Sequence, residues 1–161
     1  MGSIRIIGII SVLLFAAMAI YTSSLEPSIP AIQLTFTEKG FQSILNGWTP
    51  SQIEIFKRHF LIDYPFLVCY GVLGYVISRR TGLFAKFCPL TRVLLSYSLP
   101  IASVADATEN SLHLLFIYGT GPFSQGQYFA AGAAASTKWV LVVVFVCCAA
   151  YAKTKNCRLT G

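Results

Sequence analysis

The sequence predicts an all-α membrane protein, a bundle of four transmembrane helices with an ordered extracytoplasmic first loop. Of its 161 residues 55% are hydrophobic and 11% are charged, whereas a soluble domain has about 25% charged residues. The mean hydropathy is +0.67. The apolar residues gather in four runs, each close to the roughly 20 residues that cross a bilayer. Despite a net charge of +6, this composition excludes a soluble enzyme, a disordered tail and a nucleic-acid-binding domain.

The apolar runs predict a single membrane domain over residues 1–161. We expect helices at about 6–25, 50–78, 93–117 and 128–151, and a lid-like loop at 26–49. The first run could instead be a signal peptide, because Arg5 precedes an apolar core, but its length is that of a full span. Small residues fill positions 130–136 of the last run, which predicts close approach of a neighbouring backbone there.

The start of the second helix has a strong local signal. Thr49, Pro50 and Gln52 are typical of an N-cap, a first helical residue and a capping-box partner. The second helix should therefore begin near Pro50.

The first loop shows two different periodicities. Ile32, Leu34 and Phe36 alternate with polar residues, which is typical of a strand. The apolar residues between Phe41 and Trp48 recur at helical spacing instead. We expect this loop to lie as a lid on the membrane surface, with Trp48 at the level of the lipid headgroups.

Positive charges predict the orientation, because short loops rich in Lys and Arg stay in the cytoplasm. The N-terminal segment, the second loop and the C-terminal segment carry eight cations and no acid, namely Arg5, Arg79, Arg80, Lys86, Arg92, Lys153, Lys155 and Arg158. We therefore expect a multi-pass integral membrane protein of the endoplasmic reticulum or the plasma membrane, with both termini in the cytoplasm.

Charged residues interrupt three of the apolar runs. They are Asp63 in the second run, Asp106 and Glu109 in the third, and Lys138 in the fourth. Each Asp or Lys at the centre of a membrane helix costs roughly 2.5 to 3.5 kcal/mol if it meets lipid alone. These side chains should therefore face the interior of the bundle.

The spacing of the polar residues predicts one shared chamber. Asp106, Glu109, Asn110 and His113 follow the i, i+3, i+4, i+7 pattern of one helix face, and His59 and Asp63 form an i, i+4 pair. Their depths agree within about one helical turn. Three carboxyl groups then face one ammonium group, and the surplus implies that a carboxyl keeps its proton, as acid catalysis or proton coupling requires. Alternatively, Lys138 forms only a structural ion pair with Asp63 or Asp106.

Three segments carry a resemblance to known proteins: Leu61-Ile62-Asp63-Tyr64-Pro65-Phe66, Ala105-Asp106-Ala107-Thr108-Glu109-Asn110 and Ser136-Thr137-Lys138-Trp139. Together they resemble a group of small, largely uncharacterised four-helix integral membrane proteins, which implies a fold but no activity. A weaker resemblance is to the fold of sterol isomerases and sigma-type receptors, and it implies that Glu26 and Asp63 line a lipid-accessible cavity. In size, helix number and buried acids, the chain is also similar to small membrane epoxide hydrolases and cyclases of fungal polyketide and terpenoid pathways.

These features favour an enzyme that takes a hydrophobic small molecule from the bilayer and acts on it by acid/base catalysis without a cofactor or metal. Epoxide hydrolysis or opening, cyclisation and isomerisation, in lipid or natural-product biosynthesis, all need one acid and one base. We expect Asp106 or Glu109 to be the acid and Asp63 the base. The further candidates are binding or orienting residues, namely Asn110, Lys138, His59, His113, Tyr70 and Glu26.

Three alternatives stay open. The same acids could serve a proton-coupled transporter or a lipid- or sterol-binding protein, or the charges could pair with the helices of a partner in an assembly. His59, Asp63, Glu109 and His113 could in principle form a metal site with two histidines and two carboxylates. The expected partners are the hydrophobic substrate, membrane lipid and, as an option, a second copy of the chain, but not nucleic acid.

Overall fold

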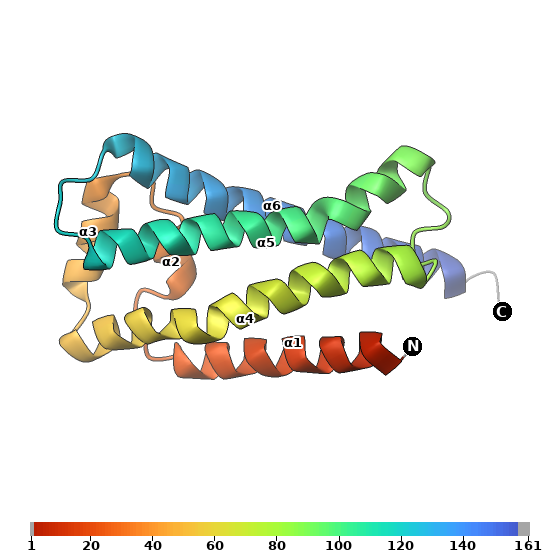
Figure 1. Ribbon diagram of the computed structural model, residues 1–161, viewed down its shortest axis with the longest axis horizontal. Coiled ribbons are helices and arrows are strands. Elements are labelled where there is room, and N and C mark those ends of the chain that lie inside the picture. Colours follow the sequence, from red (N-terminus) through yellow and green to blue (C-terminus); the bar gives the residue numbers. More distant parts are fainter. Residues whose placement is uncertain (1, 158–161) are drawn as a thin grey trace.

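The computed structural model describes residues 2–157, which form helices and no strand (Figure 1). The helices are α1 (Gly2–Tyr21), α2 (Ile29–Gln33), α3 (Glu38–Gly47), α4 (Pro50–Arg80), α5 (Pro89–Tyr118) and α6 (Gln125–Cys157). Of the cations that predict the orientation, Arg158 lies outside the described residues. The expected all-α class is therefore confirmed.

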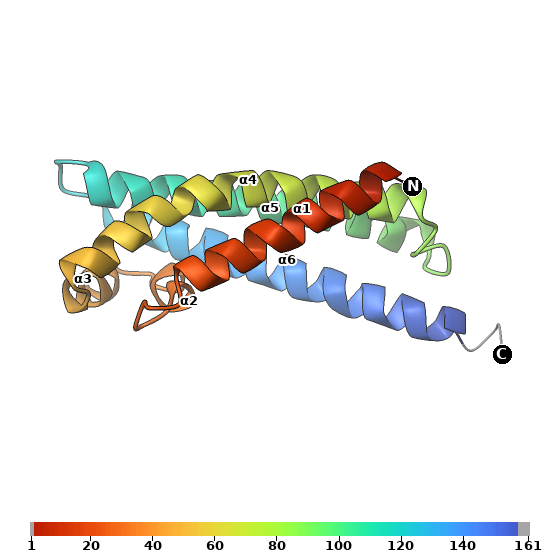
Figure 2. The same cartoon turned by 90° about the horizontal axis from the view of Figure 1, so that it is seen from below.

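The four long helices lie side by side, and each packs on the next. Helix α1 packs against α4, α4 against α5, and α5 against α6. The short helix α3 lies across one end of the bundle, and the beginning of α1 and the end of α6 lie at the opposite end (Figure 1). We call these the α3 end and the terminal end. In the view of Figure 2, α1 and α6 cross at an angle.

Three helices within the described residues are long and apolar enough to cross a membrane: α1, α4 and the Gln125–Thr154 part of α6. This agrees with a multi-pass membrane protein. Helix α5 is equally long, at 30 residues, but Asp106 and Glu109 lie within it. Its own composition therefore does not establish the predicted fourth crossing.

The helix bounds differ from the predicted ones mainly at the ends of α1, α5 and α6. The capping box before α4 is confirmed: the Thr49 amide donates to Gln52 Oε1 at 2.9 Å, and the Gln52 amide donates to Thr49 Oγ1 at 3.3 Å. Helix α1 ends four residues earlier than expected. The hydroxyls of Thr22 and Ser23 donate to the carbonyls of Met18 and Ile20, which satisfies acceptors that a longer helix would have used.

The first loop contains two short helices, and the predicted strand around residues 32–36 is wrong. Pro30 occupies the first turn of α2, where its fixed φ favours a helix. The alternation is broken because Ile32 is fully buried while Leu34 and Phe36 are exposed. Residues of the same strand face should share one environment, and these do not.

The segment between α1 and α4 packs as a cap on the α3 end. Trp48 is only 4% exposed, its ring centroid lies 5.1 Å from that of Phe56, and its Nε1 donates to the Pro27 carbonyl at 3.2 Å. Phe41 is fully buried in the same cluster of apolar side chains. Trp48 is therefore a core residue, and its position at the level of the lipid headgroups stays a prediction.

The small residues of α6 allow close approach of this cap. A Cβ atom on Gly132 would lie 2.6 Å from the Thr35 carbonyl oxygen. The neighbouring backbone predicted at residues 130–136 is therefore the stretch between α2 and α3, rather than another long helix.

Glycine also sets the distance between α4 and α5. A Cβ atom on Gly74 would lie 2.5 Å from the Leu99 side chain. We expect Gly74→Ala to lower the free energy of unfolding by about 1 to 3 kcal/mol, because it overpacks this contact. Thermal unfolding of the detergent-solubilised protein measures the change.

The matched control is Gly8→Ala in α1, where the added atom would meet only Leu73 Cδ1 at 3.9 Å. That substitution should be neutral or stabilise the helix by up to about 1 kcal/mol. Equal melting temperatures for the two variants would contradict the proposed close packing at Gly74.

Candidate functional site

A buried ion cluster joins α5 to α6. Lys138 Nζ lies 2.8 Å from Asp106 Oδ1 and 2.7 Å from Glu109 Oε2. The side chains of Lys138, Asp106 and Glu109 are 7%, 5% and 0% exposed. The i, i+3 spacing of the two acids puts both carboxyls on the face of α5 toward α6, so one ammonium group lies between them.

A second polar contact joins α4 to α5. Asn110 Nδ2 donates to Asp63 Oδ2 at 2.7 Å. The spacing on α5 leaves two roles open for Asn110, holding the neighbouring Glu109 or binding a substrate oxygen, and the structure pairs it with Asp63. The expected pairing of Lys138 with Asp106 is present, and among the described residues Asp63 forms no ion pair with Lys138.

Tyr70 extends the network along α4. Its hydroxyl donates to Asp106 Oδ2 at 3.1 Å, so Asp106 accepts a hydrogen bond on each oxygen, one from Lys138 and one from Tyr70. Two donors on one carboxylate favour its ionised form.

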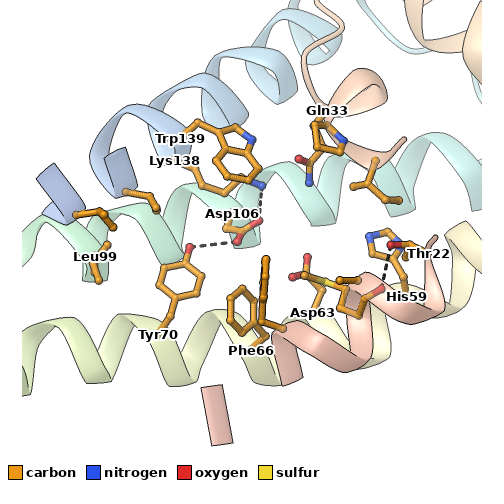
Figure 3. Close-up of a pocket in the computed structure, with 17 residues that line it drawn as sticks. Thr22, Gln33, His59, Asp63, Phe66, Tyr70, Leu99, Asp106, Lys138 and Trp139 are labelled. Carbon is orange, nitrogen blue, oxygen red and sulfur yellow. Dashed lines mark hydrogen bonds and ion pairs between the residues drawn. The ribbon is translucent and has the colours of Figure 1, made fainter. Parts of the chain in front are cut away.

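These groups meet at a cavity of about 400 Å³, a volume within the range of small-ligand sites. Its polar wall contains His59, Asp63, Tyr70, Asp106 and Lys138, together with Gln33 from α2 (Figure 3). The remainder is mostly apolar and includes Phe15, Met18 and Ala19 of α1, and Trp139, Val142 and Val146 of α6.

The cavity reaches the outer surface of the bundle between α1 and α6. Phe15 and Val146 both line it and are both exposed. No close packing joins α1 to α6 within the described residues. A ligand would therefore enter this cavity from the side of the bundle, between α1 and α6, and not from one of its ends.

Several predicted site residues lie away from the cavity. Glu109, Asn110 and His113 are buried behind its wall and do not line it. Glu26 is exposed in the turn after α1 and is not part of the cavity. Of the three proposed catalytic acids, only Asp63 and Asp106 face a ligand.

The two histidines occupy different positions. His59 lines the cavity and its Nδ1 contacts the Phe56 carbonyl. His113 lies behind, with Nδ1 3.9 Å from Glu109 Oε1. Among residues 2–157, no three His, Cys, Asp or Glu side chains are placed to hold a metal ion, so the two-histidine, two-carboxylate alternative is not formed.

Sequence reasoning missed Gln33. This side chain is 5% exposed, lines the cavity and has no hydrogen-bond partner at Oε1 among the described residues. Gln33 lies outside every apolar run, and the sequence pattern predicts it as one of the polar residues that alternate along a strand. Its position depends on how the first loop packs back on the bundle, which no local pattern indicates.

Comparisons with protein-family models, with curated proteins and with solved structures each find no match for this chain. The resemblance to four-helix membrane proteins therefore stays a prediction.

The ion cluster predicts the effect of removing its cation. Lys138→Met leaves two buried carboxyls without their cation, and we expect it to lower the free energy of unfolding by about 3 to 5 kcal/mol. Chemical denaturation in detergent measures the loss.

Two controls make this test specific. Lys39→Met removes an exposed lysine of α3 and should have little effect. Adding Asp106→Asn and Glu109→Gln to Lys138→Met removes the unpaired charges and should recover most of the lost stability. If the triple variant were as unstable as the single one, loss of packing rather than of charge pairing would be responsible.

Proposed function

We propose that the protein is an integral-membrane enzyme that takes an apolar small molecule from the bilayer and converts it by acid/base catalysis. The observation that carries the proposal is a largely apolar cavity, open between α1 and α6, with two differently paired carboxyls in its wall. Epoxide hydrolysis, cyclisation and double-bond isomerisation all need this combination of an apolar site, an acid and a base.

The contacts favour Asp63 as the acid and Asp106 as the base, which reverses the roles expected from the sequence. Asp106 receives hydrogen bonds from Lys138 and Tyr70, and we propose that these two donors stabilise its ionised form. Asp63 receives only an amide hydrogen bond, from Asn110. Since like charges close together cannot both ionise easily, the proton is retained on Asp63.

In the proposed reaction, Asp63 gives its proton to an oxygen or an alkene carbon of the substrate. Asp106 accepts a proton from water or from a neighbouring carbon. Asp106 then releases a proton to solvent and Asp63 takes one up, which restores both groups for the next cycle. Glu109 lies out of reach of the substrate and holds the Lys138 ammonium in place. Neither step needs an electron acceptor.

We propose further that all four long helices cross the membrane, with both ends of the chain on the cytoplasmic side of the endoplasmic reticulum or plasma membrane. The two acids of α5, Asp106 and Glu109, are buried in the bundle, which removes most of the cost of inserting this helix. The cations Arg5, Arg79, Arg80, Lys86, Arg92 and Lys153 belong to segments at the terminal end. This placement agrees with the positive-inside rule.

An exchange experiment tests the reaction class without knowledge of the natural substrate. The purified protein in lipid nanodiscs is incubated with a panel of polyenes in heavy water and of apolar epoxides in water enriched in oxygen-18, and the products are analysed by mass spectrometry. We expect product carrying carbon-bound deuterium from a polyene or solvent oxygen from an epoxide. Asp63→Asn and Asp106→Asn should each reduce turnover by at least about a hundredfold, as for loss of a general acid or base.

The control is Asp63→Asn with ligand binding measured in parallel, since the amide fills the same space. Retained binding without turnover supports the catalytic role. Undiminished turnover in both Asp variants would contradict the proposal.

A second candidate is a carrier or receptor for an apolar ligand, which the predominance of apolar residues around the cavity favours. Such a protein binds the same probes, but no product carries carbon-bound deuterium or solvent oxygen, and Asp63→Asn alters only affinity.

Glycosylation mapping tests the four-span topology. An Asn-Gly-Ser acceptor placed in the α5–α6 connection, at Gly121, should be modified in microsomes, whereas one placed at Gly82 should not. A Cβ atom at Gly121 meets nothing within 4 Å, so an insertion is tolerated there. If neither site were modified, α5 would not cross the membrane.

A further inference from the structure

The amide oxygen of Gln33 is a buried hydrogen-bond acceptor at the cavity and has no partner among the described residues. This atom, Oε1, accepts no hydrogen bond from the described residues, although the side chain is 95% buried. In Figure 3 the side chain points into the cavity from the side opposite Asp63. Buried acceptors in folded proteins are nearly always satisfied, so the unmet acceptor indicates a group supplied by a ligand.

Packing and hydrogen bonds hold the backbone around Gln33. The side chain therefore extends from a fixed position beside the cavity. The preceding residue, Ile32, is fully buried, and its carbonyl accepts a hydrogen bond from the Thr35 hydroxyl at 2.7 Å. Gln125 Nε2 donates to the Phe36 carbonyl at 2.8 Å. Gly132 leaves space for this stretch against α6.

The neighbouring charges decide which ligand group fits. A ligand cation would lie in the same cavity as the Lys138 ammonium, and a ligand anion would meet the carboxyls of Asp63 and Asp106. A neutral hydroxyl avoids both conflicts. It can also donate and accept, so it satisfies the Gln33 amide in either orientation of that group.

We propose that Gln33 is the specificity residue of the cavity, and that the ligand is an apolar alcohol whose hydroxyl binds the Gln33 amide. The inference rests on the proposed function, because it assumes that the cavity is the ligand site. The hydrocarbon part lies along Trp139, Val142 and Val146. Gln33 lies toward Thr22 and His59 in the cavity, away from Leu99 (Figure 3). The hydroxyl therefore binds near the α3 end, and the middle of the ligand passes Asp63 and Asp106.

Matched probes test the inference. Equilibrium binding of tritiated farnesol to the full-length protein in nanodiscs is measured, with farnesyl methyl ether and diolein as competitors. We expect the wild-type protein to bind the alcohol roughly three- to tenfold more tightly than the ether, since one hydrogen bond donated by the ligand is lost. Competition by diolein distinguishes a glycerolipid hydroxyl from a free alcohol as the natural source.

The variant Gln33→Leu should remove this preference, weakening the alcohol roughly three- to tenfold and leaving the ether unchanged. Asn46→Leu, which changes an exposed amide of α3, should keep the wild-type preference. Comparing alcohol with ether on the wild-type protein needs no variant, so the test holds even if Gln33→Leu does not fold.

Equal affinity of the wild-type protein for alcohol and ether overturns the role of Gln33 but leaves acid/base catalysis in the cavity intact. No binding of any probe overturns the inference together with its premise. Normal alcohol selectivity in a wild-type protein that incorporates neither deuterium nor solvent oxygen supports Gln33 and contradicts only the proposed catalysis.

Discussion

The burial of one ammonium group between two carboxyls is the constraint on which the rest of this structure depends. Lys138 contacts Asp106 and Glu109 inside the bundle, and separating such a buried pair leaves an uncompensated charge. Helix α6 can therefore neither rotate nor slide against α5 by a full turn without losing the contact. The same cluster explains why a helix as polar as α5 can lie among apolar neighbours, since its charges are matched within the protein.

Helix α5 serves as the centre of the bundle because its polar face is shared between two neighbours. Toward α6 it presents Asp106 and Glu109, and toward α4 it presents Asn110, which binds Asp63. Glycines in α4 bring that helix close enough for the contact. The cavity opens where this polar face meets the apolar side chains of α1, so acid groups and hydrocarbon-binding surface lie next to each other.

Much of this arrangement follows from local patterns, and the remainder depends on contacts distant in sequence. The capping box at Thr49 and the inward stripe on α5 could be predicted because each is set within one or two helical turns. The partner of Asn110 could not, because a few tens of degrees of rotation about the helix axis decide whether it faces Glu109 or Asp63. The same rotation puts Glu109 behind the cavity wall. Gln33 was missed because the position of α2 depends on Gly132 and Gln125, which lie far along the chain.

In the proposed function the ligand passes between α1 and α6, which do not pack closely on each other within the described residues. A ligand that takes this path comes from the acyl-chain region, so saturation depends on its mole fraction in the lipid rather than on its aqueous solubility. The hydrocarbon tails of the lipids then compete with the ligand for the apolar side chains that line the cavity. Selectivity for the ligand over a lipid tail has to come from the few polar atoms of the cavity, because a tail cannot form hydrogen bonds with them. Every apparent affinity measured from water also includes the partition coefficient of the ligand between water and lipid.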